Sequence, residues 1–162
     1  MSNLILNLDE LTVIKDLVQA FGLDATESRG FVSLDVGDLY NLLIGAKEIR
    51  IQQCRMENIC KKYPYNSDLS ETERKKLEQK ITADLERAFS DAGISSGIGV
   101  FTRLIVVAAD YGLTLQICDC ICSILIKHAE NCIWGTIVLK KGDDAKEMRI
   151  TVVDVYKQKK LQ

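Results

Sequence analysis

The pattern of apolar and polar positions predicts helices over most of the first 92 residues. Apolar side chains recur at helical spacing over residues 11–21. A second helix is predicted from about residue 35 to about residue 62, with its apolar stripe deepest in the first half. A third, from about residue 70 to residue 92, opens with a capping box formed by Ser70 and Glu73.

The longest apolar stretch runs from Gly97 to Ala129 and is apolar on nearly every side. A helix without a polar face must be covered by other elements, so we expect this stretch to form the centre of the fold. Gly112 divides it, which predicts two packed helices meeting at a glycine corner. Nearly complete burial is expected along it for Val106, Ile117, Ile121 and Leu125.

Residues 133–140 and 148–157 are rich in β-branched and aromatic side chains, and a Lys-Gly-Asp-Asp turn composition separates them. This arrangement predicts a C-terminal β-hairpin, to which residues 3–8 could add a third strand. The predicted fold class is therefore α+β: a mainly helical domain around a buried central helix pair, with a C-terminal hairpin. Because we find no linker, residues 1–162 are expected to form one domain.

Composition narrows the range of partners. The chain has 162 residues, 47% of them hydrophobic and 27% charged, and its net charge is −2. That balance provides no positive field for nucleic acid, so we expect no nucleic-acid partner. Arg103, Asp110 and Asp119 interrupt the central apolar stretch, which argues against a membrane span.

The six cysteines, together with an N-terminal segment unlike a signal peptide, predict a cytoplasmic protein with free thiols. Cys118, Cys120 and Cys122 form the densest cluster. On a helix Cys120 points away from the other two, so three thiolates cannot meet one metal ion. We expect core packing and no metal, and we expect Cys132 to be the thiol that reacts with reagents.

Two motifs suggest chemistry. Residues 93–97 match GxSxG around Ser95, and Asp110 or Asp119 followed by His128 completes a catalytic order. That motif needs a strand before the serine and a parallel sheet beneath it, and neither is predicted. Gly97 and Gly99 could begin a helix that binds phosphate, but no strand is predicted before them. We expect no catalytic residues and no cofactor.

These exclusions favour a non-catalytic interaction or regulatory protein of the inhibitor, immunity or adaptor type, acting by binding a protein. The second half of the 35–62 helix and the hairpin carry apolar residues on more than one face. We expect binding to a protein partner or to a second copy in a homodimer. The candidate interaction residues are Ile51, Met56, Ile59, Val153 and Val155. The alternative is a small-molecule sensor with a pocket between the central helices and the hairpin.

Overall fold

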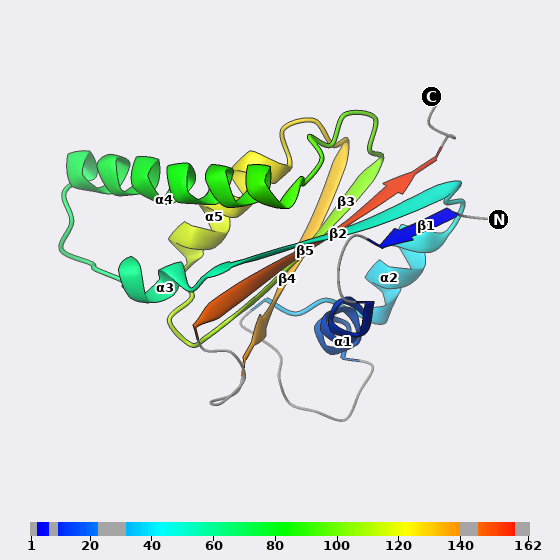
Figure 1. Cartoon of the computed structure of the whole chain (residues 1–162), viewed down its shortest axis with the longest axis horizontal. Coiled ribbons are helices and arrows are strands. Elements are labelled where there is room, and N and C mark those ends of the chain that lie inside the picture. Colours follow the sequence, from blue (N-terminus) through cyan, green and yellow to red (C-terminus); the bar gives the residue numbers. More distant parts are fainter. Residues whose placement is uncertain (1–2, 7–9, 23–31, 140–145, 158–162) are drawn as a thin grey trace.

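A computed structural model describes residues 3–6, 10–22, 32–139 and 146–157 of the chain, in which helices cover both faces of one β-sheet (Figure 1). The elements follow in the order β1 (Asn3–Leu6), α1 (Glu10–Ala20), α2 (Val36–Leu43), β2 (Glu48–Glu57), α3 (Ile59–Lys62), α4 (Glu71–Ala92), β3 (Thr102–Ala109), α5 (Leu115–Leu125), β4 (Asn131–Val138) and β5 (Glu147–Tyr156).

The sheet has five strands in the order β1-β2-β5-β3-β4. The β1–β2 and β3–β4 pairs are parallel, whereas β5 runs antiparallel to both β2 and β3. Strands β1 to β4 therefore all point one way. Strands β2, β3 and β4 all finish at one end of the sheet, which we call its carboxyl end. The opposite end, at which they start, is called the amino end.

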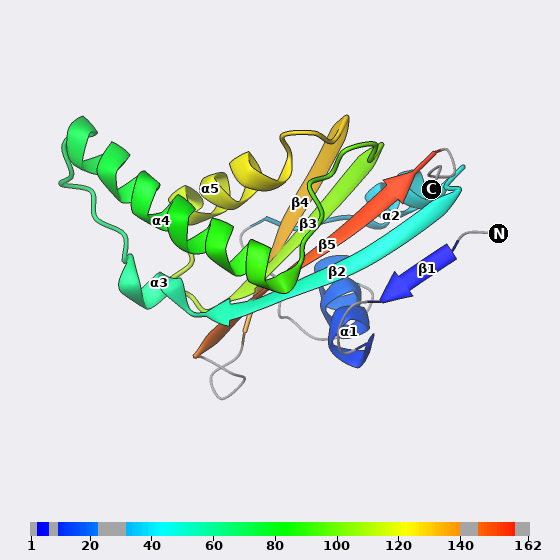
Figure 2. The same cartoon turned by 45° about the horizontal axis from the view of Figure 1, so that its top comes forward.

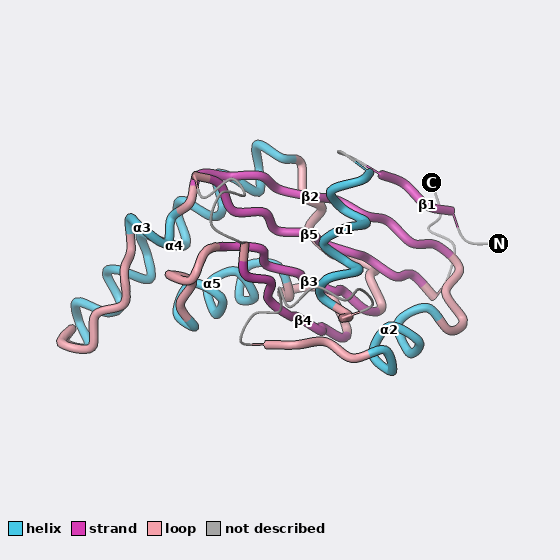
Figure 3. Tube along the Cα trace, turned by 90° about the horizontal axis from the view of Figure 1, so that it is seen from below, coloured by secondary structure: helices cyan, strands magenta, loops and turns pink. Residues whose placement is uncertain are grey.

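Two apolar cores lie on opposite faces of the sheet. Figure 2 shows α4 and α5 on one face, and Figure 3 shows α1 crossing the other face with α2 beside it. Ile81 and Leu85 of α4 pack with Ile117 and Ile121 of α5 in the first core. Val13 of α1 belongs to the second core. Within the described residues, no helix is long and apolar enough to cross a bilayer.

The prediction of a buried central helix pair is half wrong. Residues 102–109 form β3, whose eight residues are all buried, and only 115–125 form a helix. A strand covered by helices on both faces is as continuously apolar as a buried helix, so periodicity could not separate the two. The predicted burial of Val106, Ile117, Ile121 and Leu125 is confirmed.

The prediction of one helix over residues 35–62 is also wrong. Helix α2 stops at Leu43, Gly45 turns with φ +71°, and the chain then becomes β2. Tertiary pairing overrides local propensity here, because β2 lies between β1 and β5 over its first four residues.

The predicted hairpin is wrong in pairing, although both of its strands exist. β4 pairs with β3, and β5 inserts between β2 and β3. The fold is thus a mixed sheet between two helical layers and not a mainly helical domain with a C-terminal hairpin. The strand expected near residues 3–8 is confirmed as β1, which joins the same sheet.

Helices α1 and α4 confirm two of the predicted helices. Ser70 Oγ accepts a hydrogen bond from Glu73 N at 3.2 Å, as the capping box requires. Gly93 ends α4 in the left-handed region with φ +69°, and Ile94 N donates back to Phe89 O at 3.0 Å. Local side-chain chemistry sets both ends of this helix.

Candidate functional site

The loop after β3 forms a hydrogen-bonded turn at the carboxyl end of the sheet. Asp110 Oδ1 accepts a hydrogen bond from Gly112 N at 2.8 Å, and Leu113 N donates to Asp110 O at 3.2 Å. Asn58, at the end of β2, donates through Nδ2 to the other carboxylate oxygen. This fixed turn carries Tyr111 at its tip with 86% of its surface exposed.

Helix α5 begins directly after this turn. Thr114 caps it by accepting a hydrogen bond from Ile117 N at 3.2 Å. Leu115, the first helical residue, is 60% exposed. We call Tyr111 and Leu115 the carboxyl-end surface. An exposed tyrosine on a rigid turn is the kind of side chain that anchors protein interfaces.

A buried arginine organises the opposite end. Arg103 Nε and Nη2 donate to the two carboxylate oxygens of Asp154 at 2.7 and 2.9 Å, and neither side chain is exposed. The Nη1 atom donates to Leu125 O at 2.8 Å, at the end of α5. The Nη2 atom also donates to Ser95 O at 3.0 Å, in the loop between α4 and β3. One side chain therefore ties both loops to the sheet.

The loop from α4 to β3 is held from β2 as well. Gln52 Nε2 donates to Gly93 O at 2.9 Å, and Ser95 N donates to Gln52 Oε1 at 3.0 Å. Ile98 follows in this loop and is 64% exposed. It stands between Gly97 and Gly99, which both have positive φ.

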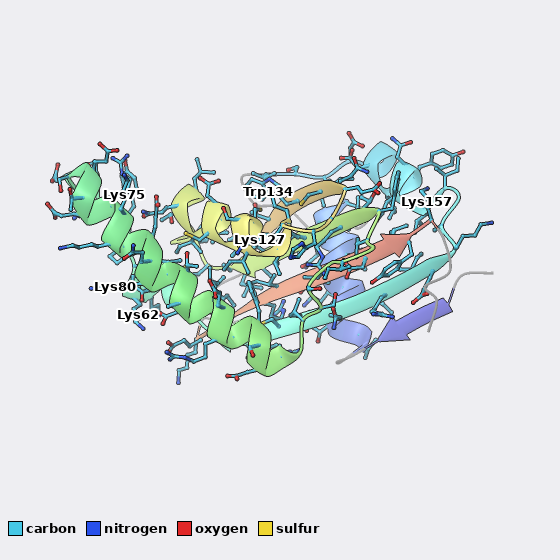
Figure 4. All side chains as sticks on the ribbon, turned by 90° about the horizontal axis from the view of Figure 1, so that it is seen from above. Lys62, Lys75, Lys80, Lys127, Trp134 and Lys157 are labelled. Carbon is cyan, nitrogen blue, oxygen red and sulfur yellow. The ribbon has the colours of Figure 1, made fainter. Side chains whose placement is uncertain are left out.

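Lys157 holds the neighbouring turn, between α2 and β2. Its Nζ donates to Ile44 O and lies 5.2 Å from the centre of the Phe101 ring. Figure 4 shows Lys157 at the opposite end of the molecule from Lys75, at the α2 end. Ile44 and Ile126 are exposed beside these loops. We call Ile44, Ile98 and Ile126 the amino-end surface.

The sequence-predicted interaction residues lie mostly in the core. Ile51, Ile59, Val153 and Val155 are buried, and a partner could reach them only if the layers separated. Ile51 and Val153 face each other across the β2–β5 pair. Met56 is half-buried and, together with Ile59, borders a groove beside α4.

The structure does not bring together the serine, aspartate and histidine residues of the catalytic order suggested by the GxSxG motif. Ser95 Oγ is hydrogen-bonded to Arg103 at 2.9 Å and to Asp154 at 3.1 Å. Asp110 lies at the other end of β3, a strand of eight residues and so roughly 26 Å long. His128 is exposed near the amino end. Among the described residues, the one carboxylate hydrogen-bonded to Ser95 is that of Asp154, which is buried and ion-paired with Arg103 and is not part of the predicted catalytic order.

The predicted helix start at Gly97 and Gly99 is wrong, since the chain continues into β3. A Cβ on Gly97 would lie 3.1 Å from Arg103 Cζ and Nη1, whereas one on Gly99 would meet nothing within 4 Å. Gly97 is thus required both by its φ of +87° and by the closeness of the guanidinium group.

The predicted core packing is confirmed for Cys118 and Cys120, which are buried, and Cys122 is half-buried against the same core. Burial raises the pKa of Cys118 to about 12 and that of Cys132 to about 11. Within the described residues, no group of three His, Cys, Asp or Glu side chains could hold a metal ion.

This mixed sheet between two helical layers places the chain in a known structural class. No protein-family model matches the sequence, and no curated protein matches it either. Solved structures do match. An FtsZ dimer from M. jannaschii has a TM-score of 0.63 at 16% identity, over 94% of this chain and 38% of that one.

Two further neighbours have lower scores. TubZ from Bacillus thuringiensis serovar israelensis, as GDP-form protofilaments, has a TM-score of 0.54 at 11% identity, over 89% of this chain and 35% of that one. CetZ2 from Haloferax volcanii, as a GTPγS-bound protofilament, has a TM-score of 0.51 at 10% identity, over 79% of this chain and 35% of that one. The chain thus spans little more than a third of the length of these neighbours.

This likeness overturns the functional prediction. An inhibitor, immunity or adaptor protein, with a small-molecule sensor as the alternative, was predicted because no catalytic set was found. The chain instead shares the fold of a part of FtsZ and of TubZ. The dimer and protofilaments named for these neighbours agree with the predicted self-association.

Proposed function

We propose that this chain is a self-associating subunit of an FtsZ/tubulin-like filament, in which the carboxyl-end surface of one copy contacts the amino-end surface of the next. The observation that carries the proposal is the pair of exposed apolar surfaces at opposite ends of one rigid sheet. Tyr111 and Leu115 lie at one end, and Ile44, Ile98 and Ile126 lie at the other. The protofilaments named for TubZ and CetZ2 support it.

Two different surfaces at opposite ends favour an open chain of subunits. A contact between unlike surfaces leaves one of each kind free after every addition, so growth continues unless the rotation closes a ring. Burying a side chain such as Tyr111 or Leu115 contributes roughly 1.5–3 kcal/mol. Both ends are fixed before association by the Asp110 and Arg103 hydrogen bonds, which lowers the entropy cost of binding.

We expect this assembly not to require GTP. Among the described loops at the carboxyl end, Gly112 is the one glycine, and its N–H already donates to Asp110. A phosphate would meet that carboxylate instead of free backbone N–H groups. The nucleotides named for TubZ and CetZ2 belong to chains of which this chain covers 35%.

Sedimentation velocity over a wide concentration range, with and without GTP, tests the proposal. Wild type should form a concentration-dependent series of species. Tyr111→Asp should raise the dissociation constant by about tenfold or more, because a charge replaces a buried aromatic anchor. Ile14→Asp is the control: Ile14 is 52% exposed on α1, which crosses one face of the sheet and belongs to neither surface. Monomeric wild type at all concentrations would contradict the proposal.

A further inference from the structure

Helix α5 extends from one of the two proposed contact surfaces to the other. It begins after the turn that ends β3 and finishes just before the loop that leads into β4 (Figure 2). Leu115 of the carboxyl-end surface is its first residue, and Ile126 of the amino-end surface is its C-cap. The charged residues on and beside α5 therefore bear on both surfaces.

Two carboxylates lie beside the carboxyl-end surface. Asp119 is exposed and follows Leu115 by four residues, so the two share one side of α5, roughly 6 Å apart along its axis. In the part of the chain that the structure describes, its side chain makes no hydrogen bond or ion pair. Asp110 accepts hydrogen bonds from two neutral N–H donors only. The exposed lysines of this end, Lys61 and Lys146, lie on α3 and before β5. The loop after β3 and the start of α5 thus carry negative charge.

Free lysines lie beside the amino-end surface. Lys127 follows Ile126 directly and is exposed beside α5 (Figure 4). Among the described residues, its side chain has no hydrogen bond or ion pair. Lys47, before β2, is also exposed, whereas Lys157 is already bound to a backbone carbonyl group. Glu130 is the exposed acid of the loop before β4. In the described loops that precede β2 and β4, lysines therefore outnumber carboxylates.

We propose that Asp119 of one copy forms an ion pair with Lys127 of the next copy, and that this pair fixes the register and direction of the head-to-tail contact. The inference rests on the proposed function. A copy added by translation along the strands brings the end of its α5 to the start of the preceding α5, because this helix runs between the two ends. Lys47 lies at the start of β2, toward α2 on the opposite face of the sheet, so Lys127 is the free cation on the α5 side.

The pair also acts against the wrong contact. In a symmetric dimer built from two carboxyl-end surfaces, the Asp110 and Asp119 carboxylates of both copies would face each other, and like charges repel. Two amino-end surfaces would likewise bring lysines together. Charged groups at the rim of a contact contribute more to orientation and association rate than to affinity. The apolar residues therefore supply the attraction, and the ion pair selects which ends meet.

Charge reversal tests the pair by sedimentation velocity at low salt. Asp119→Lys and Lys127→Asp should each raise the dissociation constant roughly fivefold, because an exposed attraction becomes a repulsion. The double variant carries the pair in reverse and should associate as wild type does. An equimolar mixture of the two single variants should associate more tightly than either alone, because every contact between unlike variants is the original pair or the reversed one.

Glu86→Lys and Lys80→Asp are the controls, because they make the same charge changes at exposed positions of α4 and should leave the dissociation constant unchanged. The inference is overturned, and the filament proposal left standing, if wild type associates and both single variants associate equally well. Equal weakening by the controls, or a double variant no tighter than the single ones, would also overturn the pair. Wild type that stays monomeric at every concentration would instead overturn the proposed function itself.

Discussion

Replacing Arg103 with methionine tests how the amino-end loops are held. Arg103 makes five hydrogen bonds, to Asp154, Leu125 O and Ser95, and both charged side chains are fully buried. The substitution leaves the Asp154 carboxylate without its cation in a medium of low polarity. Removing one member of a buried pair costs about 3–5 kcal/mol, a large part of the roughly 5–15 kcal/mol that stabilises a typical domain.

The double variant Arg103→Met with Asp154→Leu separates charge from geometry. It removes the unpaired carboxylate, so it should be more stable than Arg103→Met alone. It should still be less stable than wild type by about 1–3 kcal/mol, because the carbonyl groups of Ser95 and Leu125 lose a donor. Urea denaturation followed by circular dichroism measures all three proteins. A loss below about 1 kcal/mol for Arg103→Met, or a double variant less stable than it, would refute the reasoning.

Two smaller predictions concern stability. Gly97→Ala and Gly99→Ala share the cost of a positive φ, about 1 kcal/mol, but Gly97→Ala should destabilise more because its Cβ meets Arg103 at 3.1 Å. Equal losses in thermal denaturation would count against that contact. Burial raises the pKa of Cys54 to about 11 and those of Cys60 and Cys118 to about 12. Unfolded thiols ionise near pH ~8.5, whereas the folded thiols keep their protons to higher pH. The free energy of unfolding should therefore be unaffected by these thiols below that pH. Above it, the free energy of unfolding should fall by about 1.4 kcal/mol for each thiol and each pH unit, until the pH reaches the folded pKa. Cys118→Ala should lessen this fall in urea titrations at alkaline pH, and an unchanged slope would contradict the assignment.

Local chemistry made part of the fold predictable from sequence. The ends of α4 follow from Ser70, Glu73 and Gly93, whose contacts lie within four residues of one another. Helix α1 and strand β5 follow from periodicity and composition. What failed was pairing over long distances: β5 lies between β2 and β3, although it follows β4 in the chain. No local pattern in residues 147–156 specifies that insertion.

The candidate site was missed because β3 was read as a helix. With residues 97–112 taken as helical, Tyr111 and Ile98 became positions within a buried helix pair and not the tips of loops. One signal was present: Asp110-Tyr-Gly112 after an apolar, β-branched run is typical of a turn at a strand end. The contact that holds the turn at Ile44 could not be predicted, because the donor to its carbonyl group is Lys157, 113 residues away in the chain.

Mixing two assembly-defective variants tests the head-to-tail contact most directly. Tyr111→Asp damages the carboxyl-end surface and Ile98→Asp damages the amino-end surface. At a concentration near the wild-type dissociation constant, neither variant should therefore associate appreciably alone. Each keeps the surface that the other lacks. An equimolar mixture should therefore form one-to-one dimers that do not grow further, measured by sedimentation velocity with one variant labelled. A mixture that contains nothing but monomers would contradict the head-to-tail contact. Dimers formed by either variant alone would instead show a symmetric dimer built from one surface.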